Sequence, residues 1–136
     1  MVKDVVRRLE RYTPKRLQPD LPLPQAAVLM PLTRSEQPEL ILTRRADDLS
    51  THAGEVAFPG GRRDPTDSDL LHTALRESQE EVGLDPHCVQ VAGSLSQLVS
   101  RHGIEVTPYV GIVPQGLSYC ANIDEIDSIF SVPLDF

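Results

Sequence analysis

Three glutamates stand close together near the middle of the chain, at positions 77, 80 and 81. On a helical wheel at about 100° per residue, Glu77, Glu80 and Glu81 share one arc, and Arg76 lies beside Glu80 on the same flank. Like charges three and four positions apart destabilise a helix, so something should offset their repulsion. Carboxylate oxygens are the ligands that Mg²⁺ and Mn²⁺ prefer, whereas a charged stretch is often only a solvated helix face. From these residues alone, both interpretations stay open.

The surrounding residues predict the helix that carries this acidic arc, over residues 68–82. Residues 66–68 are candidate caps, Asp69 adds an acid in the first turn, and Gly83 is a typical stop. A second, narrow arc is expected to pack on a sheet. That packing stripe consists of Leu71, Leu75, Ser78 and Val82.

A glycine pair precedes this helix, in the sequence F-P-G-G at residues 58–61. Two glycines let the backbone bend tightly and let a carbonyl approach a ligand. From Gly61 onward the chain resembles the Nudix signature G-x5-E-x7-R-E-U-x-E-E-x-G-U, where U is apolar, and residues 76–84 read R-E-S-Q-E-E-V-G-L. Asp67 stands where the signature has Glu, one extra residue separates it from Arg76, and Ser78 replaces an apolar residue. We expect a longer loop and an intact carboxylate face, with the role of Asp67 left open.

This resemblance implies a role for each matching position. Glu77 and Glu81 would be the principal metal ligands, with Glu80 a further ligand or a base that orients water. The carbonyl of Gly61 would complete the shell, and Arg76 would orient a glutamate. The implied chemistry is attack of water on a diphosphate, with Mg²⁺ or Mn²⁺ neutralising the phosphoryl oxygens.

A second string resembles a motif that precedes the Nudix box in coenzyme A pyrophosphatases, L-L-T-x-R-[SA]-x3-R-x3-G-x3-F-P-G-G. Here it reads I-L-T-R-R-A at 41–46, then Gly54 and F-P-G-G, with Ser50 in place of the second Arg. The resemblance implies hydrolysis of coenzyme A or its thioesters to 3′,5′-ADP and a 4′-phosphopantetheine species. A basic contact to the 3′-phosphate is then expected. The candidates are Arg45 first, then Arg62 or Arg63.

Other interpretations remain open for these residues. Arg44 and Arg45 could simply finish a strand, with one of them paired to Asp47 or Asp48. His52 could contact substrate or be an ordinary loop histidine. Three further acids could serve as a distal base or metal ligand, or be structural or solvated. These acids are Glu105, Asp124 and Glu125.

Two rival functions accompany the coenzyme A hypothesis. One is hydrolysis of another nucleoside diphosphate derivative such as ADP-ribose. The other is a non-catalytic Nudix-fold module that binds nucleotides or a partner; loss of the glutamates would favour it, yet all three are present.

The remaining patterns predict an α+β fold in a single domain over residues 1–136, and the resemblance implies that it is a Nudix-type α/β/α sandwich with a mixed sheet. An N-terminal helix (2–12) and a proline-rich lead-in (to residue 24) precede the motif at 41–61 and the box at 61–84. We expect two hairpins, one from residues 26–31 and 39–44 and the other from residues 89–99 and 104–113. A brief strand at 55–58 should precede a sharp break at 59–61. The segment 123–130 is ambiguous between helix and strand. The resemblance implies that the C-terminal part of the fold is missing, so apolar surface near 126–136 should be exposed or covered in a homodimer.

Bulk properties narrow the class of protein. The formal net charge is −7, which disfavours a duplex nucleic-acid partner. The small nucleotide diphosphate substrate that the resemblance implies is also anionic, and a bound divalent cation is one device that would offset the repulsion. The two cysteines form no disulfide framework, no apolar run approaches a membrane span, and the first ten residues do not read as a leader. A cytoplasmic location is expected.

Overall fold

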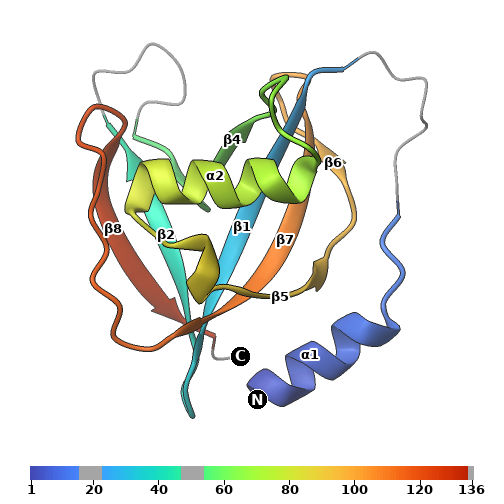
Figure 1. Ribbon diagram of the computed structural model, residues 1–136, viewed down its shortest axis with the longest axis vertical. Coiled ribbons are helices and arrows are strands. Elements are labelled where there is room, and N and C mark those ends of the chain that lie inside the picture. The colour runs from blue at the N-terminus through green and yellow to red at the C-terminus, as the bar shows by residue number, and fades with distance from the viewer. Residues whose placement is uncertain (16–22, 47–53, 135–136) are drawn as a thin grey trace.

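The computed structural model describes residues 1–15, 23–46 and 54–134. Two α-helices, one short 3₁₀ helix and eight strands are arranged in these ranges (Figure 1). In chain order they are α1 Val2–Arg11, β1 Gln25–Arg34, β2 Glu39–Arg45, β3 Val56–Ala57, β4 Gly60–Arg62, α2 Leu70–Val82, η1 Pro86–Cys88, β5 Gln90–Ser94, β6 Leu98–Val99, β7 Glu105–Pro114 and β8 Ile126–Pro133.

The sheet is mixed, as the sequence predicts. Its centre is a parallel pair, β1 and β7, in register from Gln25 opposite Glu105 to Arg34 opposite Pro114. β5 and β6 pair antiparallel with β7, and β4 pairs antiparallel with β1. On the other side β2 meets β1 at a single described register pair and runs antiparallel to β8 and β3. The segment that was ambiguous in the sequence therefore becomes the strand β8.

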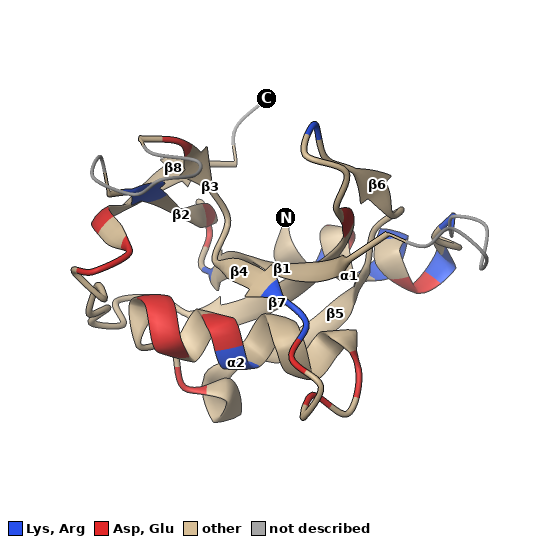
Figure 2. Cartoon of the chain, turned by 90° about the horizontal axis from the view of Figure 1, so that it is seen from above, with Lys and Arg blue, Asp and Glu red and all other residues tan. Residues whose placement is uncertain are grey.

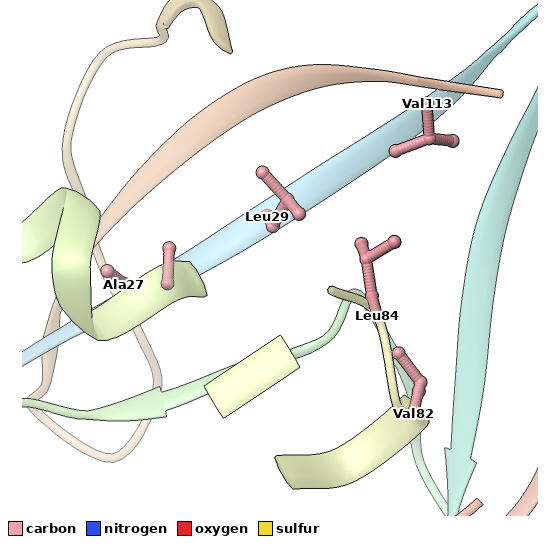
Figure 3. Packing of buried hydrophobic residues seen from close by; sticks show 6 residues of the cluster. Ala27, Leu29, Val82, Leu84 and Val113 are labelled. Carbon is pink, nitrogen blue, oxygen red and sulfur yellow. The ribbon is translucent and has the colours of Figure 1, made fainter. Parts of the chain in front are cut away.

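Helix α2 lies across β1, β4 and β7 (Figure 1) and encloses the main core with them. Side chains alternate across β1, so Ala27 and Leu29 face α2 while Leu32 faces the opposite side, where α1 packs. The core cluster under α2 is fully or almost fully buried (Figure 3). It consists of Ala27, Leu29, Ala74, Val82, Leu84 and Val113.

Local signals explain where α2 begins and ends. The side chain of Asp69 accepts a hydrogen bond from the backbone N–H of His72 at 2.7 Å, so Asp69 is the N-cap and the helix starts at residue 70, not 68. Gly83 adopts a left-handed φ of 72° and donates its N–H to the Gln79 carbonyl at 3.0 Å.

In the predicted packing stripe of α2, Ser78 and Val82 are buried and Leu75 packs against the core. Leu71 is only half-buried, however, and the buried face also contains Thr73, Ala74 and Glu81. The glycine pair forms the strand β4 and not a break, because the missing Cβ lets it lie against β1: a Cβ on Gly60 would come within 2.3 Å of the Ala27 carbonyl oxygen. Within the described residues, no helix is long and apolar enough to cross a membrane.

Candidate active site

A buried carboxylate anchors the charged face of α2. The side chain of Asp67 has no exposed surface and accepts hydrogen bonds from Arg76 Nε at 2.8 Å and Nη2 at 2.9 Å. The hydroxyl of Thr73 donates to it at 2.8 Å, and the backbone N–H of Asp64 donates at 2.9 Å. Its hydrogen bonds with Arg76, Asp64 and Thr73 hold the pKa of Asp67 well below its usual range. Asp67, whose role the sequence left open, is therefore the fixed point of the site.

Arg76 links the buried carboxylate of Asp67 to two of the glutamates on α2. Its Nη1 donates to Glu77 Oε1 at 2.9 Å and to the two Glu80 oxygens at 3.2 and 3.3 Å, and its Nη2 donates to the Arg62 carbonyl at 3.3 Å. One guanidinium thus contacts three carboxylates, two of them on its own helix. Figure 2 shows the result as acidic bands along α2 with a single basic band beside them.

The glycine pair brings backbone to the other two glutamates. The N–H of Gly60 donates to Glu81 Oε1 at 3.0 Å. A Cβ on Gly61 would lie 2.6 Å from Glu77 Oε2, so a larger residue would displace that carboxylate from its present position. Strand β4 and helix α2 therefore enclose Glu77 and Glu81 between them, while Glu80 remains 55% exposed at the edge.

Burial and crowding leave this pair of carboxylates poorly neutralised. Burial raises the pKa of Glu81 to about 7, with repulsion from Glu77 and Glu125 adding to it and the Gly60 N–H and the Arg45 charge opposing it. The pKa of Glu77 is also raised, first by burial, against the opposing effect of Arg76. A nearby cation would lower the free energy of the ionised forms.

The residues present fit a hard divalent cation. Glu77 and Glu81 offer carboxylate oxygens with Glu80 at the margin, and the carbonyl of Gly61 belongs to the adjoining strand. In the described ranges, no three His, Cys, Asp or Glu side chains already converge as a ready metal cage. Glu77 is instead directed at Arg76, and Glu81 at the Gly60 N–H. Binding a cation would replace these contacts in part.

The three arginines predicted to bind substrate differ in their surroundings. Arg45, half-buried at the end of β2, is close enough to Glu81 to oppose the rise of its pKa, and its Nε is buried without a hydrogen-bond partner in the described chain. Arg63 donates to Gln25 Oε1 at 3.2 Å and to the Asp67 carbonyl at 3.4 Å, which ties it to the start of β1. Arg62 is exposed at the end of β4.

Arg44 and Arg45 are the last two residues of β2, as one interpretation of the sequence predicts. Arg44 pairs with Asp127 on β8 at 2.8 Å. The suggested partners Asp47 and Asp48, like Ser50 and His52, lie outside the described residues.

The three distal acids are separated by the fold. Glu105 is buried on β7 opposite Gln25, and Asp124 is exposed in the turn before β8. Glu125 is half-buried, and its charge raises the pKa of both Glu77 and Glu81. Of the three, Glu125 is the one that this coupling places beside the acidic face of α2.

Comparisons with known proteins agree with this architecture. The model of the NUDIX domain family matches residues 23–130. Relatives described as uncharacterized Nudix hydrolase NudL include one from Enterobacter sp. (strain 638), 46% identical over 96% of this chain and 68% of its own length. Another, from Yersinia enterocolitica, is 50% identical over 80% of this chain and 56% of its own length. The chain thus spans roughly two thirds or less of these relatives.

Solved structures show the same fold at low identity. A C. elegans Ap4A hydrolase in a binary complex superposes with a TM-score of 0.67 at 18% identity, covering 78% of this chain and 77% of that one. The NUDIX domain of Shewanella oneidensis NrtR in complex with ADP ribose gives a TM-score of 0.64 at 16% identity, covering 92% of this chain and 77% of that one. Given the matching family model, the identity to these relatives and the glutamate face held against a glycine strand, this chain belongs to the Nudix hydrolase family.

Proposed function

We propose that this protein hydrolyses the pyrophosphate bond of coenzyme A or its thioesters, with a divalent metal, to 3′,5′-ADP and a 4′-phosphopantetheine species. The observation that carries the hydrolysis is the face of α2 against β4: Arg76, held by Asp67, contacts Glu77, and the Gly60 N–H contacts Glu81, so both desolvated glutamates are fixed there. Nudix hydrolases generally use divalent metal ions on nucleotide diphosphate substrates. The choice of coenzyme A rests on the motif at residues 41–61.

The chain's own residues have distinct tasks in this reaction. Glu77 and Glu81 would hold Mg²⁺ or Mn²⁺, which when bound supplies positive charge to the phosphoryl oxygens. Arg76 keeps Glu77 and Glu80 in place from its fixed position on Asp67. A water oxygen would form a bond to phosphorus while the bridging P–O bond breaks; the bridging oxygen leaves with one phosphate product, and the water gives up a proton to Glu80 or to solvent. Glu80, exposed at the margin, would orient that water or be a further ligand of the cation.

The main test is turnover on a panel of coenzyme A, acetyl-coenzyme A, ADP-ribose and dinucleotides with Mg²⁺ or Mn²⁺. We expect coenzyme A to have the highest kcat/KM. Glu77→Gln and Glu81→Gln should lose most turnover while remaining folded by circular dichroism. Near-normal rates in both variants would contradict the site assignment.

A second experiment tests the basic contact. Coenzyme A has a 3′-phosphate that 3′-dephospho-coenzyme A lacks, and Arg45 has a buried Nε with no partner near Glu81. Arg45→Ala should reduce the preference for coenzyme A by roughly tenfold or more, the effect of losing a charge-assisted contact of about 1.5–3 kcal/mol. Arg44→Ala is the matched control, because Arg44 pairs with Asp127 on the strand. An unchanged preference in Arg45→Ala would make Arg45 structural.

The alternative within the same class is a different nucleoside diphosphate derivative. A solved NUDIX domain of similar fold is in complex with ADP ribose, which is the observation in its favour. If wild type prefers ADP-ribose, the coenzyme A proposal fails and pyrophosphohydrolase chemistry stands. A non-catalytic binding module would be indicated by metal binding without turnover of any diphosphate in the panel.

A further inference from the structure

The loop that joins β6 to β7 contacts the segment of chain that leads into the candidate active site. In this loop the guanidinium of Arg101 forms an ion pair with the carboxylate of Glu55, the residue before β3. The two residues are 46 positions apart in the sequence. In the sheet, β3 and β6 lie on opposite sides of the central strand β1 (Figure 2). The ion pair therefore joins two segments that approach the same end of the sheet from different sides.

Glu55 lies close along the chain to groups that belong to the site. Its carbonyl oxygen accepts the backbone N–H of Arg45 at 2.9 Å, at the end of β2. Five residues after it in the sequence, the N–H of Gly60 donates to Glu81. Five residues of chain span at most about 18 Å, so the backbone of Glu55 is no farther than that from the glycine that contacts Glu81. A substrate with an arm on each side of its diphosphate can extend from Glu81 towards Arg101.

The start of the loop is fixed by the segment that follows α1. The Ser96 hydroxyl contacts the Tyr12 hydroxyl and accepts the backbone N–H of Lys15 at 3.1 Å. The N–H of Gln97 donates to the Lys15 carbonyl at 3.1 Å. These contacts hold the residues just before β6, so the position of Arg101 is set by the fold on one side and by Glu55 on the other.

Exposed apolar side chains accompany both members of the ion pair. Val56 follows Glu55 directly, and Leu98 and Val99 form β6, shortly before Arg101; all three are exposed large hydrophobic residues. Binding sites for small molecules combine apolar side chains with a few polar groups that fix orientation. Apolar side chains beside an arginine therefore suit a ligand with an apolar part and an anionic part, as a nucleotide derivative has.

The ion pair is exchangeable because it is exposed. The side chain of Arg101 is 73% exposed and that of Glu55 is 33% exposed. Such pairs contribute little to folding stability, because water screens them. A guanidinium donates paired hydrogen bonds to a phosphate as well as to a carboxylate. Before substrate binds, Glu55 can therefore direct Arg101 towards the site without holding it there strongly.

We propose that Arg101 is a further substrate-binding residue, whose guanidinium exchanges the carboxylate of Glu55 for a phosphate group of the substrate. This rests on the proposed function only in that the site takes a nucleoside diphosphate derivative, and it does not depend on which derivative that is. Glu55 directs the arginine in the free protein and competes with the substrate for it.

The test is the affinity for coenzyme A and for ADP-ribose, measured by isothermal titration calorimetry in chelator so that a metal-dependent enzyme does not turn over. Arg101→Gln should weaken binding by about tenfold. Glu55→Gln should instead tighten binding by about two- to fivefold, because the competing carboxylate is lost. The double variant should bind as weakly as Arg101→Gln, since the gain acts through Arg101. Arg8→Gln removes an exposed positive charge from α1 and is the control, with an expected change below about twofold.

Two results would overturn this inference. One is wild-type affinity in Arg101→Gln, and the other is equal weakening in Arg101→Gln and Glu55→Gln, which would make the ion pair a structural contact. Weakening with coenzyme A alone supports a contact to the 3′-phosphate, and weakening with both ligands supports a contact to the diphosphate. Thermal unfolding should place both single variants within about 4 °C of wild type.

Failure of the proposed function is distinguishable from failure of this inference. If wild type binds the two ligands and the variants behave as expected, but no diphosphate is hydrolysed once Mg²⁺ is added, the hydrolysis alone is wrong and the role of Arg101 stands. If wild type binds neither ligand, both proposals are overturned.

Discussion

Replacing the buried Asp67 by Asn should cost more stability than neutralising any one of the three glutamates on the charged face of α2. Asp67 has a fully buried side chain and accepts four hydrogen bonds, two of them from Arg76. Asparagine has one acceptor oxygen and one donor group, so it would direct N–H groups at donors already present. Arg76 would keep its charge and lose its bidentate partner.

The magnitude follows from how far the pair is buried. Breaking a buried ion pair costs about 3–5 kcal/mol. The side chain of Arg76 is 24% exposed and retains Glu77 and Glu80 as partners, so we expect the lower part of that range or slightly less, about 2–3 kcal/mol. For a chain of this length each kcal/mol lowers the melting temperature by roughly 3–5 °C. Asp67→Asn should therefore melt about 6–15 °C below wild type.

The assay is equilibrium unfolding in guanidinium chloride, with Asp124→Asn as a charge-matched control on an exposed residue. Because the folded-state pKa of Asp67 is depressed, its contribution is present above its unfolded pKa near 4 and is lost as pH falls towards the folded value. The difference between wild type and Asp67→Asn should be full at pH 7 and shrink below about pH 4. A difference under about 0.5 kcal/mol at pH 7, no larger than for an ordinary surface substitution, would refute the argument.

The elements that sequence predicts well are those with local signals. Helix α2 ends at its predicted glycine stop, Gly83, and begins two residues later than predicted, because its N-cap is Asp69 and not one of residues 66–68. The central pairing of β1 with β7 joins residues 80 positions apart, and no periodic pattern in the sequence indicates which strands pair. The hairpin predicted from β1 and β2 is consequently a minor contact, with Leu32 opposite Leu40, while β1 uses its full length on β7.

The candidate site likewise has a local part that the sequence predicts and a long-range part that it does not. A helical wheel places Glu77, Glu80 and Glu81 on one arc, but it contains no information on what covers that arc. The sequence therefore could not show that Glu81 is buried against the Gly60 N–H while Glu80 stays in solvent. Asp67 was visible only as a departure from the signature. Its contact with Arg76 joins residues nine positions apart on either side of the helix start, and no local sequence pattern predicts it.

Three further predictions follow from the packing of the glutamates. Gly61→Ala should reduce turnover at least tenfold, measured as kcat/KM with saturating Mg²⁺, because its Cβ would meet Glu77 Oε2 at 2.6 Å and displace it. Arg76→Lys should lower both stability and turnover, since a lysine cannot bind Asp67 in a bidentate manner and reach Glu77 together; retention of wild-type stability in thermal unfolding would contradict this. Glu81→Gln should stabilise the metal-free protein at pH 8. Its folded pKa of about 7 lies above the unfolded value, so the folded state binds the proton more tightly and wild type loses stability as pH rises from about 4.5 to about 7. The shift corresponds to at most about 3 kcal/mol, and the amide oxygen can still accept the Gly60 N–H, so a gain of about 1–3 kcal/mol is expected. Unfolding of both proteins in chelator at pH 8 and pH 4.5 checks the sign. The gain in the free energy of unfolding should be largest at pH 8 and vanish near pH 4.5. It should reverse when Mg²⁺ is added, because the cation stabilises only the carboxylate form.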